Sequence, residues 1–331
     1  MTQSPYLLAT QAVAPGCGCP VSDALQRLID ENPNRAIFFP DGEYLLDRPL
    51  CTPADPRRSV SLVLSSYAVL RAAERFPAGE AMVRLGAIHP ANDIRTPGSN
   101  YSFSGGILDG GKVASGISID GGRETVVRDV SIKHVRIGLH IRHSANNGSS
   151  DADVSGVNII GSGTTDSIGV LLEGYDNTLT NMRIADVFCG VLLRSSGNSL
   201  RNIHPLYTCD YTDYAASVGF DDRAGNNWYS FCYSDHFGVG FRNAPGASCV
   251  YTDCFTMWYC GRGGRHVAFR AEGQLRSVLT NFRIGFCNAE TENVILEVGE
   301  AGGSGVLERL SANTALTSDE TYRDYLVGGM F

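Results

Sequence analysis

Four carboxylates of this sequence lie where they could act as acids and bases. Asp221, Asp222 and Asp235 fall within a stretch of fifteen residues, and Glu173 ends a similar apolar segment earlier in the chain. Two carboxyl groups facing each other across a sugar can hydrolyse its glycosidic bond, with retention at a separation of about 5–5.5 Å and with inversion at about 6.5–9.5 Å. These four residues are therefore the catalytic candidates.

Basic and aromatic side chains near these carboxylates could bind a sugar. Tyr and Trp present an apolar ring with a polar tip, which suits the two kinds of surface that a pyranose offers. Both tryptophans and many Tyr, Asp, Arg and His residues fall between residues 204 and 266. Arg and His would also suit β-elimination, which needs a cation beside a uronate carboxylate and a base for the α-proton. The candidates for substrate binding are Arg183, Arg194, His204, Tyr233, His236, Arg242, Trp258 and Arg270.

The elements that must position these residues are short strands repeated along the chain. A pattern of apolar, any, apolar and charged residues occurs eight times, with 21 to 31 residues between successive copies and a mean of about 25. Alternation with period two is typical of a strand that is buried on one side. Repeats of this length stack as a solenoid, in which neighbouring coils bury a common core. The aligned segments are Gly116–Asp120, Gly138–Arg142, Gly169–Glu173, Gly190–Arg194, Ser217–Asp221, Gly238–Arg242, His266–Arg270 and Asn293–Glu297.

The charged residue that ends each segment would form an outward column, with neighbours about 4.8 Å apart. Most neighbours in this column have opposite charges. The column could be a ladder of exposed ion pairs, each contributing about 0–1 kcal/mol. It could also be a groove of acids and bases across which a glycan lies. Both interpretations stay open at this point.

A second strand in each coil contains an Asn or Asp. Leu179–Met182 and Leu200–Ile203 share the form apolar, any, Asn, apolar. Asn and Asp tolerate turn geometry, so we expect a stacked column of these residues at a bend between strands. Arg183 and His204 each follow this Asn by two residues and should lie at equivalent outward positions on adjacent coils. Trp228 aligns with the first residue of this form, which predicts a buried ring.

Together these patterns predict an all-β fold, a single-stranded right-handed parallel β-helix of roughly 10 coils of about 25 residues. We expect one domain over residues 1–331, with a cap helix and first coil at 20–58, coils at 59–311 and a C-terminal tail or cap at 312–331. The short N-terminal helix should begin with a capping box at Asp23–Gln26 and cover the open end of the core with Leu25 and Ile29.

Three motifs resemble those of a known superfamily. Asp23–Gln26, Phe38–Tyr44 and Gly105–Gly111 look like the opening of the pectate lyase superfamily, and of its polygalacturonase-related branch in particular. The resemblance implies a β-helix fold and carbohydrate chemistry of unspecified kind. The sequence lacks the catalytic signature of the polygalacturonases, so no catalytic role is carried over.

Composition and charge exclude some classes of partner. The formal charge of −8 is opposite to the basic face that phosphate binding requires, so we expect no nucleic-acid partner. No apolar run reaches the length of about 18 residues that a membrane span needs, and residues 1–19 lack the pattern of a signal peptide. We therefore expect a cytoplasmic protein without membrane partner, metal or cofactor. Its ten cysteines should be reduced and fill small buried positions.

The leading hypothesis is a carbohydrate-active enzyme that cleaves or rearranges glycosidic bonds of an oligo- or polysaccharide. It would use carboxylate acid/base catalysis, as glycoside hydrolases and intramolecular glycosyltransferases do. A polysaccharide lyase or uronate epimerase that uses Arg and His is the first alternative. A non-catalytic glycan-binding or fibre-like β-helix is the second. A homotrimer would suit a fibre, and also those transferases of the superfamily whose sites lie between subunits.

Overall fold

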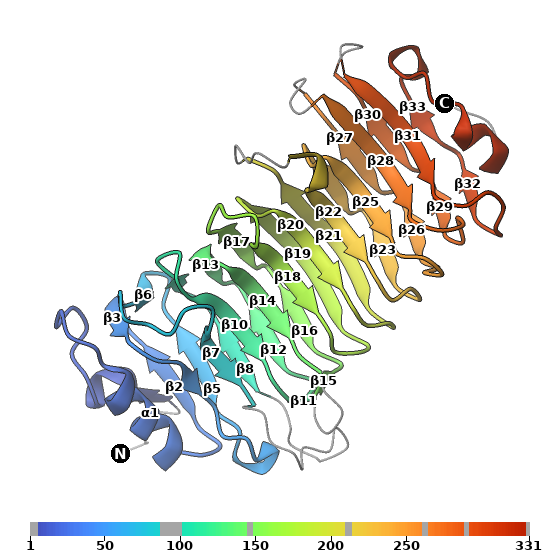
Figure 1. Cartoon of the computed structure of the whole chain (residues 1–331). Helices are drawn as coiled ribbons and strands as arrows, with labels where there is room; N and C mark the ends of the chain where they lie inside the picture. Colours follow the sequence, from blue (N-terminus) through green and yellow to red (C-terminus); the bar gives the residue numbers. More distant parts are fainter. Residues whose placement is uncertain are drawn as a thin grey trace. The chain divides into compact units, whose positions relative to one another are not determined.

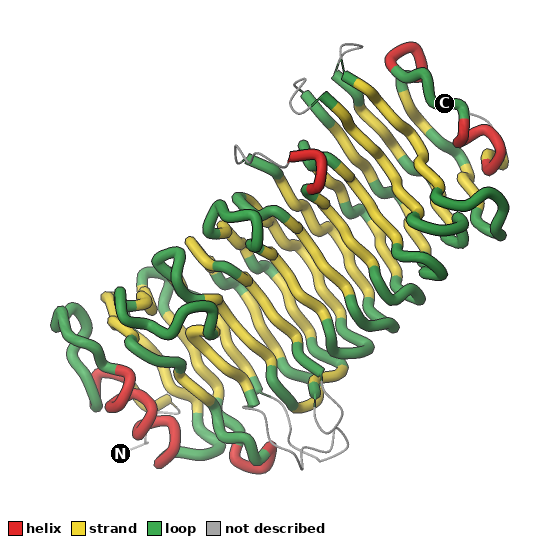
Figure 2. The backbone as a smooth tube through the Cα atoms, in the orientation of Figure 1, coloured by secondary structure: helices red, strands yellow, loops and turns green. Residues whose placement is uncertain are grey.

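The computed structural model describes residues 6–86, 101–143, 148–208, 214–259, 264–287 and 291–328. The chain forms two compact units, the first comprising residues 1–162 and 170–178 and the second residues 163–169 and 179–331. Each unit is built from short parallel strands joined by turns, as the alternation of yellow and green in Figure 2 shows. The two units are therefore described one after the other.

The first unit contains parallel sheets of short strands (Figure 1). Its strands are β1 (Tyr6–Leu8), β2 (Ala36–Phe39), β3 (Gly42–Leu46), β4 (Leu50–Cys51), β5 (Ser61–Leu64), β6 (Ala68–Ala72), β7 (Ala81–Leu85), β8 (Ser102–Ser104), β9 (Ile107–Asp109), β10 (Ser115–Ile119), β11 (Gly122–Arg123), β12 (Val126–Arg128), β13 (Ser131–Val135), β14 (Ile137–Ile141), β15 (Ser149–Ser150), β16 (Asp153–Ser155), β17 (Asn158–Gly161) and β18 (Ile168–Leu172). The long sheet has two strands per coil, in the orders β1-β2-β5-β8-β12-β16 and β3-β6-β9-β13-β17. The short sheet has the order β4-β7-β10-β14-β18.

The second unit repeats this plan. Its strands are β19 (Thr178–Ala185), β20 (Cys189–Leu193), β21 (Ser199–Leu206), β22 (Val218–Asp222), β23 (Trp228–Ser230), β24 (Tyr233–Asp235), β25 (Val239–Asn243), β26 (Val250–Thr252), β27 (Phe255–Met257), β28 (Arg265–Ala271), β29 (Val278–Thr280), β30 (Arg283–Gly285), β31 (Glu292–Val298), β32 (Val306–Glu308), β33 (Ser311–Ala312) and β34 (Leu326–Val327). The long sheet follows β21-β23-β26-β29-β32-β34 and β21-β24-β27-β30-β33, with β19 beside β21. The short sheet follows β20-β22-β25-β28-β31.

The prediction of an all-β parallel β-helix is confirmed. In the first unit Ile117 pairs with Leu139, as the repeat predicted. In the second, Val218, Val239 and Val267 stack in one buried column. Like side chains stacked on like side chains bury a core that no single coil could form, which is how a solenoid is stabilised.

One step of the predicted alignment is wrong by two residues. β20 pairs with β22 so that Val191 faces Phe220, whereas the repeat placed it beside Val218. Gly190 consequently lies against Gly219, and a Cβ on Gly190 would be 2.4 Å from the Gly219 carbonyl oxygen. Because backbone approaches this close accept only glycine, contact between the glycines sets the register here.

This contact predicts a large cost for one small substitution. The Gly190→Ala variant is expected to lose about 1–3 kcal/mol in free energy of unfolding, because its methyl group has no room beside Gly219 and Pro205. The matched control is Gly285→Ala, whose Cβ would meet its nearest neighbour at 3.5 Å, an ordinary contact. Urea unfolding followed by circular dichroism measures both. Equal stability of the two variants would contradict the register.

A column of residues in the left-handed region of backbone space forms the bend within each coil of the long sheet. In the second unit their φ angles lie between 52° and 61°. The predicted stack is confirmed at one step, because the Asn202 side-chain amide donates to Asn181 Oδ1 at 2.9 Å. We call this set the bend column; its members in the second unit are Asn181, Asn202, Phe231, Asp253, Asn281 and Arg309.

The prediction that Trp228 is buried is wrong. Leu200 pairs with Tyr229 rather than with Trp228, and a slip of one residue moves every side chain of a strand to the other face. Tyr229 is accordingly buried, whereas Trp228 is 52% exposed. The same slip puts Phe231 in the bend column, and its ring is also 52% exposed.

A helix at the N-terminal end packs on the first coil. α1 (Ser22–Glu31) buries Leu25, as predicted. Gln26 ties the helix to β4, because its amide accepts from the Cys51 N–H at 2.8 Å and donates to the Cys51 carbonyl at 2.9 Å. The predicted capping box is wrong: α1 begins at Ser22, so Asp23 lies inside its first turn, and the N-cap residue makes no side-chain bond. At the other end of the chain the predicted tail or cap contains a short 3-10 helix, Thr321–Tyr325.

Cysteines of this chain occupy two kinds of environment. Cys232, Cys249 and Cys254 are buried, as expected of small apolar residues, but Cys17 and Cys19 are exposed, with their sulfur atoms 2.9 Å apart. None of the helices within the described ranges has the length and apolar character of a membrane span.

Candidate functional site

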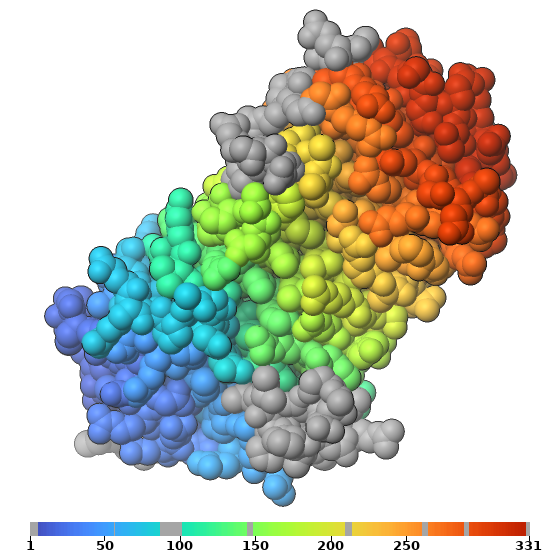
Figure 3. Space-filling view, viewed as in Figure 1, coloured from blue at the N-terminus to red at the C-terminus, as the bar shows by residue number. Residues whose placement is uncertain are grey.

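The outward face of the long sheet in the second unit carries aromatic, basic and amide side chains on successive coils. A column two residues beyond the bend column faces outward, and its strands pair in register from β21 to β33. We call it the outer column; its members are Arg183, His204, Tyr233, Phe255, Arg283 and Ser311. The bend and outer columns together are called the outer strip. Successive coils of this unit keep their order at the surface, from yellow to red in Figure 3.

Four side chains meet around Asp235. The His204 ring stacks on Tyr233 with centroids 3.6 Å apart and an interplanar angle of 25°. His204 Nε2 lies 3.6 Å from one oxygen of Asp235, and His236 Nδ1 lies 2.7 Å from the other. The Tyr259 ring covers His236, with centroids 3.7 Å apart. We call this group the Asp235 cluster. It unites Asp235, one of the four candidate acids, with three of the residues predicted to bind substrate.

Hydrogen bonds within the cluster assign the tautomer of His236. Its Nε2 accepts the backbone N–H of Tyr259 at 3.2 Å, so the proton of a neutral ring is on Nδ1 and is donated to Asp235. This bond orients the carboxylate, and its second oxygen is directed at His204. A carboxylate that faces an imidazole in this way can stabilise the imidazolium formed when the His takes a proton.

The acidities of two groups fit this arrangement. Burial by itself raises the pKa of Asp235, but the nearby His204 and the hydrogen bond from His236 outweigh it, and the pKa lies below its ordinary value. Burial raises the pKa of Tyr233, against the opposing effect of Arg183. At neutral pH the cluster therefore offers an ionised carboxylate and a protonated phenol side by side.

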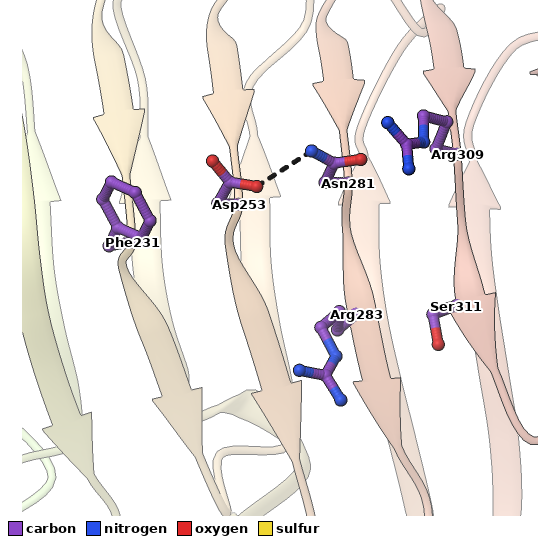
Figure 4. Close-up of a pocket in the computed structure, with 6 residues that line it drawn as sticks. All are labelled: Phe231, Asp253, Asn281, Arg283, Arg309 and Ser311. Carbon is purple, nitrogen blue, oxygen red and sulfur yellow. Dashed lines mark hydrogen bonds between the residues drawn. The ribbon is translucent and has the colours of Figure 1, made fainter. Parts of the chain in front are cut away.

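A recess opens in the outer strip towards its C-terminal end. It has a volume of about 480 Å³ and is lined by Phe231, Asp253, Asn281, Arg283, Arg309 and Ser311. Figure 4 shows four of these in a row across neighbouring strands, with Arg283 and Ser311 in a second row. The Asn281 amide donates to Asp253 Oδ1 at 2.9 Å, and the Arg283 guanidinium lies 5.7 Å from the centre of the Phe255 ring.

The predicted charged column of the short sheet forms ion pairs in the second unit. Arg242 donates two hydrogen bonds to Asp221, at 2.9 and 2.7 Å. Arg223 bridges Asp221 and Glu272 at 2.8 and 2.6 Å. Arg270 Nε lies 2.8 Å from Glu297. These contacts favour the ladder over the groove.

Asp222 lies in the interior of the coil, fully buried. Its carboxylate accepts hydrogen bonds from Asn227 at 2.9 Å, Tyr229 at 2.7 Å and the thiol of Cys249 at 3.1 Å. Burial first, and then the charge of Asp222, raise the pKa of Tyr229 and of Cys249, so both remain protonated donors. The expectation that Asp222 or Asp221 faces a sugar with Asp235 is not met: Asp221 is paired on the short sheet and Asp222 points inward.

The other candidates from the sequence are not members of the cluster. Glu173 belongs to the first unit and contacts His140 Nε2 at 2.8 Å, and Arg194 is exposed in the turn after β20. Trp258, a candidate for substrate binding, does not reach the surface, because its ring is buried against His266 and Phe286 and its N–H donates to a backbone carbonyl. Two parts of the segment 204–266, which is rich in polar and aromatic residues, lie outside the described residues: 209–213 and 260–263. Within the described ones, no group of three or more His, Cys, Asp or Glu side chains could hold a metal ion.

None of the six residues that line the recess was among the candidates from the sequence, including Phe231, Arg283 and Arg309. The repeat does contain a signal for Arg283. Arg283 follows Asn281 by two residues, as Arg183 follows Asn181 and His204 follows Asn202. Applying that rule to Asn281 would have found Arg283, whereas Phe231 and Arg309 occupy the bend position itself, where their coils have no Asn.

Comparison with known proteins supports the fold. No family model matches the sequence, and no curated protein matches it. Solved structures of the tailspike protein of E. coli bacteriophage HK620 are similar: a double mutant (10% identity, TM-score 0.65), a single mutant in complex with pentasaccharide (10%, 0.66) and the protein in complex with pentasaccharide (11%, 0.61). Each alignment covers 98% of this chain and 67% of the tailspike chain. At these identities the likeness shows the fold, a parallel β-helix.

Proposed function

We propose that this chain binds an oligo- or polysaccharide along the outer strip and cleaves it at the Asp235 cluster. The single observation that carries the proposal is the meeting of His204, Tyr233 and Asp235 on an outward face lined by aromatic and basic side chains. Pentasaccharide complexes of the tailspike protein with the same fold support a glycan as the ligand.

The groups of the cluster fit β-elimination in a uronate-containing chain. Arg183 would offset the charge of the uronate carboxylate, and His204, held by Asp235, would take the proton from the adjacent carbon. The electrons of that C–H bond form the C=C bond as the C–O bond to the next sugar breaks. Tyr233, whose phenol is protonated, would give its proton to the departing oxygen. This mechanism is the lyase alternative raised in the sequence analysis, which uses Arg and His, with Tyr233 added as the acid.

Hydrolysis by two carboxylates is the second candidate. It is favoured by the presence of a second carboxylate, Asp253, at the bend of the coil that follows Asp235. Asp221 and Asp222 are less suited to it, because ion pairs and buried hydrogen bonds occupy their carboxylates.

Analysis of products from a panel of neutral and uronate oligosaccharides tests the proposal. Elimination gives fragments without added water, one of them unsaturated and absorbing in the ultraviolet; hydrolysis gives fragments heavier by one water in total. Binding without product would leave the non-catalytic alternative. The proposal is refuted if no glycan of the panel binds and none gives a product. The homotrimer stays a prediction, which light scattering on the purified chain can check.

A further inference from the structure

Two members of the bend column have unusual side chains for their backbone. A φ near 55° suits Gly, Asn and Asp and is strained for other residues. Within the second unit Asn181, Asn202, Asp253 and Asn281 follow this rule, whereas Phe231 and Arg309 do not. Strained residues of this kind cluster at active sites and ligand-binding sites. Both of these exceptions line the recess.

The charge of the recess is opposite to that of the chain. Arg283 and Arg309 line it together with one carboxylate, Asp253, in a protein of net charge −8. Asn281 holds Asp253 by a hydrogen bond of 2.9 Å. The Arg283 guanidinium is placed over Phe255. Guanidinium groups bind carboxylates and sulfates in preference to neutral hydroxyls.

We propose that the recess binds an anionic substituent of the glycan, a carboxylate or a sulfate, between Arg283 and Arg309. The sugar ring that carries it lies against the exposed face of Phe231, and Ser311 and Asn281 bind its hydroxyls. This inference rests on the proposed function and names the class of its substrate. Phe231 precedes Tyr233 by two residues in the same coil, so the recess holds a sugar near the one that is cleaved.

The test compares three forms of one oligosaccharide: a uronate chain, its carboxyl-reduced neutral counterpart and a sulfated neutral counterpart. Calorimetry measures their affinities for the full chain and for Arg283→Gln, Arg309→Asn and Phe231→Asn. The matched control is Arg276→Gln, which removes a charge from an exposed turn away from the recess. Thermal unfolding of every variant is measured beside binding.

We expect the charged forms to bind more tightly than the neutral one, and the carboxylate and sulfate arms identify the preferred anion. Arg309→Asn and Arg283→Gln should weaken binding of the charged form about 10- to 100-fold and leave the neutral form unchanged. Phe231→Asn should weaken binding of both forms. The two Asn variants should unfold at or above the temperature of the unaltered chain, because Asn tolerates this backbone.

Two results would count against the inference in different ways. If all three forms bind equally and the Arg variants do not differ from Arg276→Gln, the recess does not bind an anion, although the proposed function stands. If no form binds, the proposed function fails and the inference fails with it.

Discussion

Replacing Asp222 by Ala should destabilise the protein strongly, by about 3–5 kcal/mol in free energy of unfolding. The carboxylate is buried and accepts from Asn227, Tyr229 and Cys249, and also from the backbone N–H groups of Ala224 and Gly225. Without it, these five donors would lose their shared acceptor, and most of them are buried. The midpoint of urea unfolding, followed by circular dichroism, measures the effect.

A milder variant keeps this prediction testable if the first does not fold. Tyr229→Phe removes one of the five donors and should cost about 0.5–1.5 kcal/mol, the value of one hydrogen bond. Glu300→Ala, an exposed carboxylate of the same unit, is the control and should change stability by less than about 0.5 kcal/mol. Wild-type stability of Asp222→Ala, together with loss of glycan cleavage, would instead make Asp222 a catalytic residue.

The second large effect is expected on activity. His204→Gln should lower the rate of glycan cleavage about 10²- to 10⁴-fold, the usual contribution of a general base, with little change in binding. His204 stacks on Tyr233 and faces the Asp235 carboxylate. Initial rates over a range of glycan concentrations separate kcat from KM.

The control for this variant is another His–Asp pair. His134 Nδ1 lies 3.0 Å from Asp109 at a more exposed position in the first unit, and His134→Gln should leave the rate unchanged. If the unaltered chain cleaves a glycan and both His variants keep its full rate, the Asp235 cluster is not the site of cleavage.

The cluster should also affect stability with a defined pH dependence. The pKa of Asp235 is lowered in the folded chain, so its contribution is present above the ordinary Asp pKa of about 3.9 and is lost as pH falls through the folded value. Asp235→Asn should therefore be less stable than the unaltered chain at pH 7 and approach it in stability below about pH 4. Thermal unfolding across this range measures the difference. A difference that is independent of pH would show that the Asp235 carboxylate is not held by its histidines.

The sequence alone determined the repeating unit of the fold, a coil of short parallel strands. Apolar residues that alternate with period two predicted the strands, and their recurrence predicted the stacking of Ile117 on Leu139 and of Val218 on Val239. The Asn residues at 181 and 202 predicted the bend, because Asn is among the few residues that favour its backbone. These features depend on local preference and on burial, which a single sequence displays directly.

Only the tertiary structure decided the register where turns differ in length. The repeat predicted Val191 beside Val218, whereas β20 pairs with β22 two residues further on, where Gly190 lies against Gly219. At β23 a shift of one residue exposed Trp228 and placed Phe231 at the bend, against its own backbone preference. His204 and Asp235 lie on neighbouring coils, and residues so far apart in the chain meet only once the register is set. Periodicity determines which face of a strand is buried, but the atoms in contact between coils decide which residues become neighbours.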